Sequence, residues 1–91
     1  MTDPVARVEA DAPQRCDAQG VATYPDGYAA HRTPEATTAS WDGDRYRLGY
    51  PATVIVPGPS VDAPPVSKVV VVTCTLTFEN DRVVVAGWAA A

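Results

Sequence analysis

Hydrophobic and polar residues alternate most regularly near the end of the chain, from residue 67 to residue 79. The odd-numbered positions become polar after Val69 and Val71, with three threonines and then Glu79, and the even-numbered positions from 70 to 78 are all apolar. A side-chain period of two residues is typical of a strand that is buried on one face. The pattern therefore predicts a strand over 67–79 with one face toward the core. That face consists of Val70, Val72, Cys74, Leu76 and Phe78.

A two-residue loop at 80–81 predicts a hairpin between this strand and the residues that follow. The register is self-consistent because a charged pair closes the hairpin on the outer face while apolar pairs stack inward, and a slip by one residue would reverse both faces. Trp88 then lies opposite Thr73 on the outer face. The predicted pairs are Glu79 with Arg82, Phe78 with Val83, Leu76 with Val85 and Cys74 with Gly87.

Two further turns are predicted upstream. Residues 25–27, Pro-Asp-Gly, predict a hairpin in which Tyr24 and Tyr28 are cross-strand neighbours. Asp42-Gly43 predicts a second hairpin, whose return strand alternates between an apolar and a basic face. Pro51 marks a bend or an edge position in the continuation to Val56. The alternating residues are Tyr46, Leu48 and Tyr50 on one face and Arg45, Arg47 and Gly49 on the other.

The first twenty residues carry weaker signals. Residues 5–10 alternate and predict a short strand. Asp11, Pro13 and Gly20 then supply start and stop signals for one or two helical turns that carry Cys16. Pro13 argues against a longer helix.

The fold class follows from these elements and from six glycines and nine prolines among 91 residues. Such frequent turn residues favour short strands over long helices. We expect an all-β fold in one domain over residues 1–91: a small antiparallel sandwich or partly open barrel of five to seven short strands, with one short helical turn near the N-terminus.

Cys16 and Cys74 are the only cysteines. Cys74 faces the predicted core, and its predicted neighbour Gly87 leaves room for a second sulfur. A bridge would stabilise the fold by about 4 kcal/mol, a large share of what a small domain can hold. We therefore expect a Cys16–Cys74 disulfide and an exported protein whose signal peptide is not part of this sequence. Two buried thiols in a cytosolic protein are the alternative.

Charge and hydropathy exclude two classes of partner. The formal net charge is −4, so the chain offers no positive surface for nucleic acid or anionic lipid. No apolar run approaches the ~20 residues that a membrane span requires. We expect neither nucleic acid nor a membrane as partner.

Motifs for catalysis and metal binding are missing from the sequence. His31 is the only histidine, and no GxSxG motif surrounds any serine. Asp42 and Asp44 flank a turn glycine without the further acidic residues of a calcium loop, and two cysteines without a CxxC motif do not make a zinc site. We expect no enzymatic activity, no cofactor and no metal.

The connection over residues 57–65 is the first candidate for partner binding. It is rich in proline and longer than the two to five residues that a hairpin needs. A stiff loop loses little conformational entropy on binding, although a solvated crossover between two sheets would have the same composition. The candidate contact residues are Pro57, Gly58, Pro59, Ser60, Val61 and Asp62.

An aromatic and basic surface is the second candidate. Four large aromatic residues exceed what one small core can comfortably bury, and Trp, Tyr and Arg are favoured at the centres of interfaces. Burial in the core is the alternative. The candidate residues are Trp41, Arg45, Arg47 and Trp88, with Tyr46 and Tyr50 nearby.

Three functions compete on this basis. The first is a non-catalytic protein-interaction or assembly domain that binds a protein partner through the 57–65 loop and the Trp/Tyr/Arg surface. The second is an exported inhibitor of a secreted protease or glycosidase, because serine-protease inhibitors present stiff loops of this kind. The third is a small ligand-binding barrel or enzyme with an interior lined by Tyr46, Leu48 and Tyr50. Homo-oligomers through an edge strand at 5–10 or 89–91 are a further hypothesis.

Overall fold

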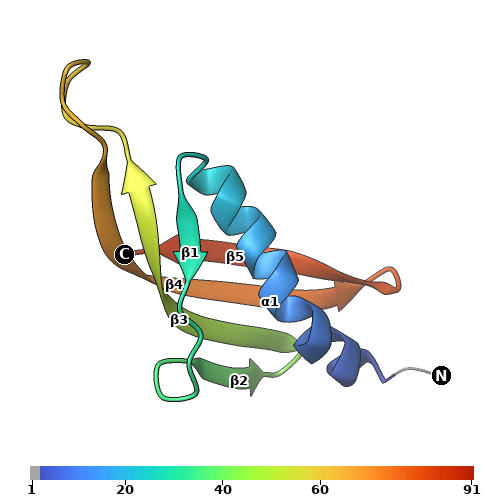
Figure 1. Ribbon diagram of the computed structural model, residues 1–91. Coiled ribbons are helices and arrows are strands. Elements are labelled where there is room, and N and C mark those ends of the chain that lie inside the picture. Colours follow the sequence, from blue (N-terminus) through green and yellow to red (C-terminus); the bar gives the residue numbers. More distant parts are fainter. Residues whose placement is uncertain (1–2) are drawn as a thin grey trace.

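The computed structural model describes residues 3–91, which form one helix and a five-stranded antiparallel sheet (Figure 1). The predicted all-β fold class is confirmed, with a strand number inside the predicted range. The layer that covers the sheet is the helix. The elements are α1 (Pro4–Thr23), β1 (Tyr28–Ala30), β2 (Thr38–Asp42), β3 (Arg45–Val56), β4 (Val66–Glu79) and β5 (Arg82–Ala90).

The sheet has the order β1-β3-β4-β5, and β2 also pairs with β3. β1 and β2 lie end to end along one edge of β3, because β2 reaches Gly49 and β1 begins its pairing at Ala52. Pro51 falls at the break between them. Its carbonyl accepts a hydrogen bond from the His31 N–H at 2.9 Å, so its missing N–H faces the same break and interrupts no strand pair. β3 therefore passes through Pro51 without ending.

The helix is the main correction to the sequence-based expectations. It has 20 residues, so the predicted strand over 5–10 and the limit of two helical turns were wrong, and no edge strand exists at 5–10. Asp3 caps the first turn by accepting a hydrogen bond from the Val5 N–H at 3.0 Å, and Pro4 occupies the first turn, where its missing N–H costs nothing.

Pro13 lies inside this helix and removes one helical hydrogen bond, the one to the Glu9 carbonyl. Glu9 is exposed, so water can satisfy that carbonyl. A buried stripe of small and medium residues offsets the loss, because every fourth residue of α1 packs on the sheet. The stripe consists of Val8, Ala12, Cys16 and Gly20.

The hairpin between β4 and β5 is confirmed as far as its middle. Asn80 and Asp81 have φ values of 50° and 66°, as a two-residue primed turn requires. Beyond Val85 an irregularity inserts one extra residue, Ala86, into β5. The predicted pairing of Cys74 with Gly87 is therefore wrong. The observed pairs are Glu79 with Arg82, Phe78 with Val83, Leu76 with Val85, Thr75 with Gly87 and Cys74 with Trp88.

Of the two turns predicted upstream, one is a hairpin loop shifted by one residue and the other is not a hairpin. The loop between β2 and β3 is 43–44, one residue later than predicted, and Gly43 takes the positive φ of 63°. The predicted hairpin around Tyr24 and Tyr28 is wrong. Tyr24 caps the C-terminus of α1, and the turn after it leads into β1, where Tyr28 pairs with Val54.

The core lies between α1 and one face of the sheet, whereas the opposite face has no covering layer among the described residues. Alternate residues of β4 show the difference: Val72 is fully buried, while Val69 and Val71 are 72% and 59% exposed. The buried set consists of Val8, Ala12, Cys16, Leu48, Tyr50, Ala52, Val54, Val70, Val72, Cys74, Leu76 and Val83.

Two neighbouring valines test this division of the sheet into faces. We expect Val72→Ala to lower the free energy of unfolding by about 2 to 3 kcal/mol, because it leaves a cavity beneath α1. Val71→Ala makes the same chemical change on the exposed face and should cost less than about 0.5 kcal/mol. Urea unfolding of both variants measures the difference, and equal losses would contradict the assignment of the faces.

Candidate functional site

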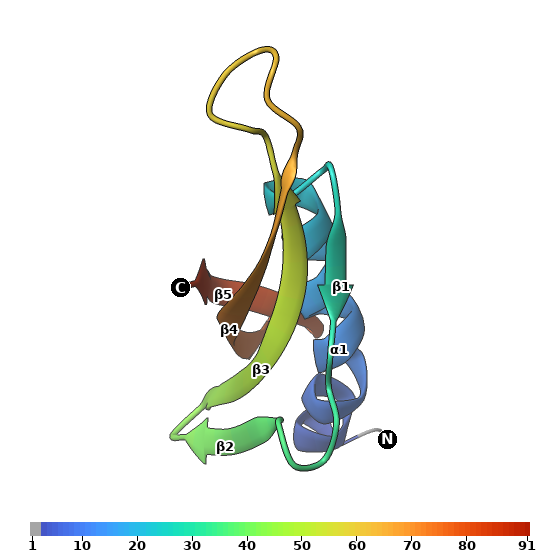
Figure 2. The same ribbon diagram turned by 60° about the vertical axis from the view of Figure 1, so that its left-hand side comes forward.

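The loop over residues 57–65 is the most prominent surface feature of the molecule. β3 and β4 stay paired up to Val56 and Val66, and the residues between them project beyond the body in both views (Figures 1 and 2). The segment is therefore a hairpin loop and not a crossover between two sheets. Its base is held by the longest strand pair of the protein.

Contacts inside the loop draw its two arms together. The Ala63 N–H donates a hydrogen bond to the Ser60 carbonyl at 3.1 Å. A Cβ atom on Gly58 would lie 2.6 Å from the Pro64 carbonyl oxygen, so only glycine fits at this close approach. Val61 lies at the far turn with its side chain fully exposed, at 102% of the reference area. The loop thus presents an apolar side chain on a narrow, proline-rich support.

The second predicted surface does not join the loop. Arg45 and Arg47 lie at the start of β3, and twelve strand residues at ~3.3 Å each separate that end from the loop. Trp41 lies at the same end of the sheet but on the face that α1 covers, where its ring centroid is 5.1 Å from that of Tyr46 and the rings are tilted. Arg45 and Arg47 alternate with Tyr46 and lie on the opposite face. Trp41 also borders an apolar hollow, which Val5, Val8 and Phe78 line as well. The loop and the Trp41 region are two separate surfaces.

Trp88 occupies a different place from the one that the sequence predicted. The extra residue in β5 turns it to the face that α1 covers, where its ring lies 6.2 Å from the Tyr24 ring and 6.3 Å from the Tyr28 ring. The prediction of an outer-face Trp88 is therefore wrong. Trp88 closes the end of the core beneath the C-terminal turn of α1.

Cys16 and Cys74 are joined by a disulfide, as expected from the sequence. Their Cα atoms are 6.0 Å apart and both side chains are fully buried. The bridge connects the middle of α1 to the middle of β4.

A polar cluster that sequence reasoning missed links the helix to β1, β3 and the segment after β1. The Asp17 carboxylate accepts two hydrogen bonds from the Arg32 guanidinium, at 2.6 and 2.7 Å, and one from the Tyr28 hydroxyl at 3.0 Å. A carboxylate can only accept, so the single hydroxyl proton of Tyr28 goes to Asp17. In the 2.6 Å contact between the two tyrosine hydroxyls, Tyr50 is therefore the donor. The Arg32 guanidinium also lies 5.0 Å from the centroid of the Tyr50 ring.

The chemistry of this cluster favours a structural role. Burial and the hydrogen bond with Tyr50 raise the pKa of Tyr28 far above its ordinary value, so its hydroxyl stays protonated in the folded state. The bond to Asp17 raises the pKa of Arg32. Each of these groups is partnered within the cluster.

The pH dependence of unfolding tests the Tyr28 bonds. Since the pKa of Tyr28 is higher in the folded than in the unfolded state, its stabilising contribution is complete below pH 10 and is lost as the pH rises above 10. We expect Tyr28→Phe to cost about 1 kcal/mol at pH 7 and to flatten the decline between pH 9 and pH 11, both measured by urea unfolding. Tyr24→Phe is the control and should keep the wild-type slope. An unchanged slope in Tyr28→Phe would contradict the assignment.

Other candidates for chemistry remain isolated in the fold. His31 is exposed, and its Nε2 atom lies 2.8 Å from the Thr53 hydroxyl. Among residues 3–91 no three His, Cys, Asp or Glu side chains come together as metal ligands. The described part of the chain also contains no helix that is long and apolar enough to cross a membrane.

Comparisons of this chain with protein-family models, with curated proteins and with solved structures give no match. Function is therefore inferred from the residues and surfaces of this chain alone.

Proposed function

We propose that the protein is a non-catalytic interaction domain that binds a protein partner through the loop over residues 57–65. The observation that carries the proposal is the projection of this loop from the body, with Val61 fully exposed at its far turn. An exposed apolar side chain on a projecting segment can enter a partner's pocket without any rearrangement of the fold.

The composition of the loop supports the same role. The loop contains four prolines, each of which fixes one backbone dihedral: Pro57, Pro59, Pro64 and Pro65. Gly58 allows the two arms of the loop to lie in close contact. Fewer conformations are then lost on binding, which leaves more of the contact energy as affinity. Asp62 beside Val61 would add a charged contact at the rim.

Trp41 on one face and Arg45 with Arg47 on the other are proposed as two further contacts for a partner that reaches the start of β3. Trp88 takes no part, because it packs inside the domain. The third hypothesis, a ligand-binding interior, is not proposed, because α1 fills the space over Leu48 and Tyr50.

Partner capture with matched variants tests the loop. We expect a protein that the immobilised wild-type domain retains from an extract of the source organism to be lost when residues 58–64 are replaced by a short Gly/Ser turn. In a binding assay with that protein, Val61→Asp should weaken affinity at least tenfold. Val69→Asp puts the same charge on the uncovered face of the sheet and should change affinity less than twofold. Retention by the loop-replaced variant would refute the assignment.

Inhibition of a secreted hydrolase is the second candidate function. The disulfide favours it, because disulfides persist in oxidising compartments and a small bridged scaffold resists unfolding by the enzyme it would block. A panel of secreted proteases and glycosidases should then include one that is inhibited at a one-to-one ratio. Substitutions from Ser60 to Asp62 should abolish that inhibition. If the protein inhibits no member of a broad panel, this candidate is dismissed and the interaction domain stands.

A further inference from the structure

The strand β5 has an open edge. It ends the sheet order, and among the described residues it pairs only with β4. Its backbone groups alternate in direction. Glu79 and Arg82 flank the two-residue turn as a hydrogen-bonded pair, so the N–H and C=O groups of Val83 and Val85 point away from β4. An open edge with free donors and acceptors can pair with another strand.

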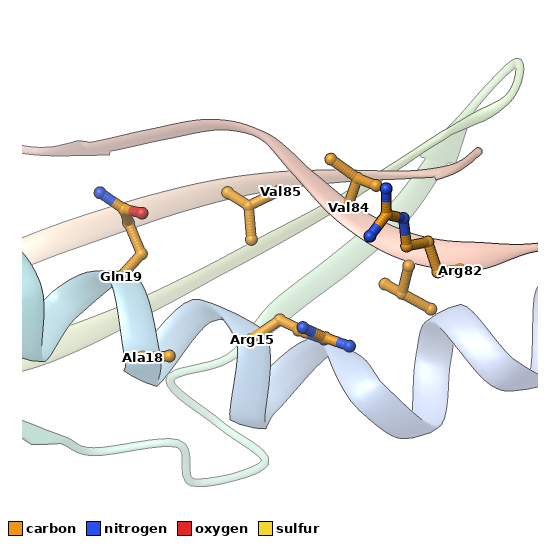
Figure 3. Close-up of a pocket in the computed structure, with 7 residues that line it drawn as sticks. Arg15, Ala18, Gln19, Arg82, Val84 and Val85 are labelled. Carbon is orange, nitrogen blue, oxygen red and sulfur yellow. The ribbon is translucent and has the colours of Figure 1, made fainter. Parts of the chain in front are cut away.

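A hollow runs along this edge, between β5 and α1 (Figure 3). Four consecutive residues of β5, 82–85, line this hollow. Neighbouring side chains of a strand point to opposite faces of the sheet, so a hollow that touches all four must run along the edge of the strand and not over one face. The helix forms the facing wall with Arg15, Ala18 and Gln19. A strand added here would have β5 on one side and the helix on the other. We refer to this hollow as the α1–β5 groove.

Two arginines line the groove, and they favour an added strand that carries negative charge. Arg15 on the helix and Arg82 on β5 lie toward the same end of the groove, and Gln19 lies toward the other (Figure 3). Within residues 3–91 neither arginine has a carboxylate within 4.0 Å, although Glu79 pairs across from Arg82 in the sheet and Asp11 lies one turn before Arg15. Two unpaired cations in a chain of net charge −4 favour a ligand with carboxylates.

A second copy of the chain fits this groove less well. A two-fold, antiparallel pairing of two β5 edges would set the arginine end of one groove against the opposite end of the other. Residues 82–90 contain no Asp or Glu, so the β5 strand of a second copy would bring no carboxylate to either arginine.

We infer that the α1–β5 groove binds an extended acidic peptide segment as an additional strand beside β5. Main-chain hydrogen bonds to Val83 and Val85 hold the segment, and Arg15 and Arg82 select its carboxylates. The site is separate from the loop over residues 57–65, so each can fail without the other.

The test uses an acetylated hexapeptide, Thr-Val-Thr-Val-Glu-Glu, titrated into the isotopically labelled protein and followed by NMR. We expect chemical-shift changes at the Val83 and Val85 amides and at the Gln19 side chain. The same peptide with N-methyl groups on alternate amides should not bind, and a version that ends in two lysines should bind at least tenfold more weakly.

Two double variants complete the experiment. Arg15→Ala with Arg82→Ala should weaken binding of the acidic peptide about tenfold. Arg7→Ala with Lys68→Ala removes the same charge elsewhere and should change the affinity less than twofold. The inference is overturned if 2 mM peptide leaves the Val83 and Val85 amides unmoved, if the lysine peptide binds equally well, or if the arginine pair can be removed without loss.

Discussion

A covalent bond between the middle of α1 and the middle of β4 holds the helix on the sheet. The Cys16–Cys74 bridge spans 58 positions, and by chain entropy it contributes about 4 kcal/mol. Small residues make the contact close: Ala12 and Gly20 lie one turn on either side of Cys16, and a Cβ on Gly20 would overlap the Tyr28 ring. The Asp17 cluster then fixes the same turn of the helix to β1 and β3. A single-layer sheet in a short chain depends on this attached helix for its core.

The surface that the helix leaves exposed contains several separate candidate sites for binding. The β3–β4 hairpin carries the projecting loop, the β2–β3 hairpin carries Trp41 on one face and the two arginines on the other, and β5 leaves an open edge beside α1. Each of these surfaces offers contacts that a polypeptide partner can use, which is the ground on which binding is proposed as the function.

The sequence alone was sufficient for the features that local rules determine. Asn80-Asp81 and the flanking alternation predict the β4–β5 hairpin up to Val85, because the turn type and the buried face both fix the register. The extra residue at Ala86 has no local signal in the sequence, so the pairing beyond it was missed. The helix was missed because Pro13 outweighed the Asp3-Pro4 start and the four-residue spacing of Val8, Ala12, Cys16 and Gly20. Asp17 and Arg32 meet only in the folded chain.

The mass of the protein after alkylation under denaturing conditions, without reduction, tests the central role of the bridge most directly. Material from an oxidising compartment should take up no alkyl group as a monomer, and a reduced sample should take up two. Two alkyl groups on the unreduced protein would mean that Cys16 and Cys74 are thiols. The helix would then be held on the sheet by packing and the Asp17 cluster alone, which contradicts the central role of the bridge.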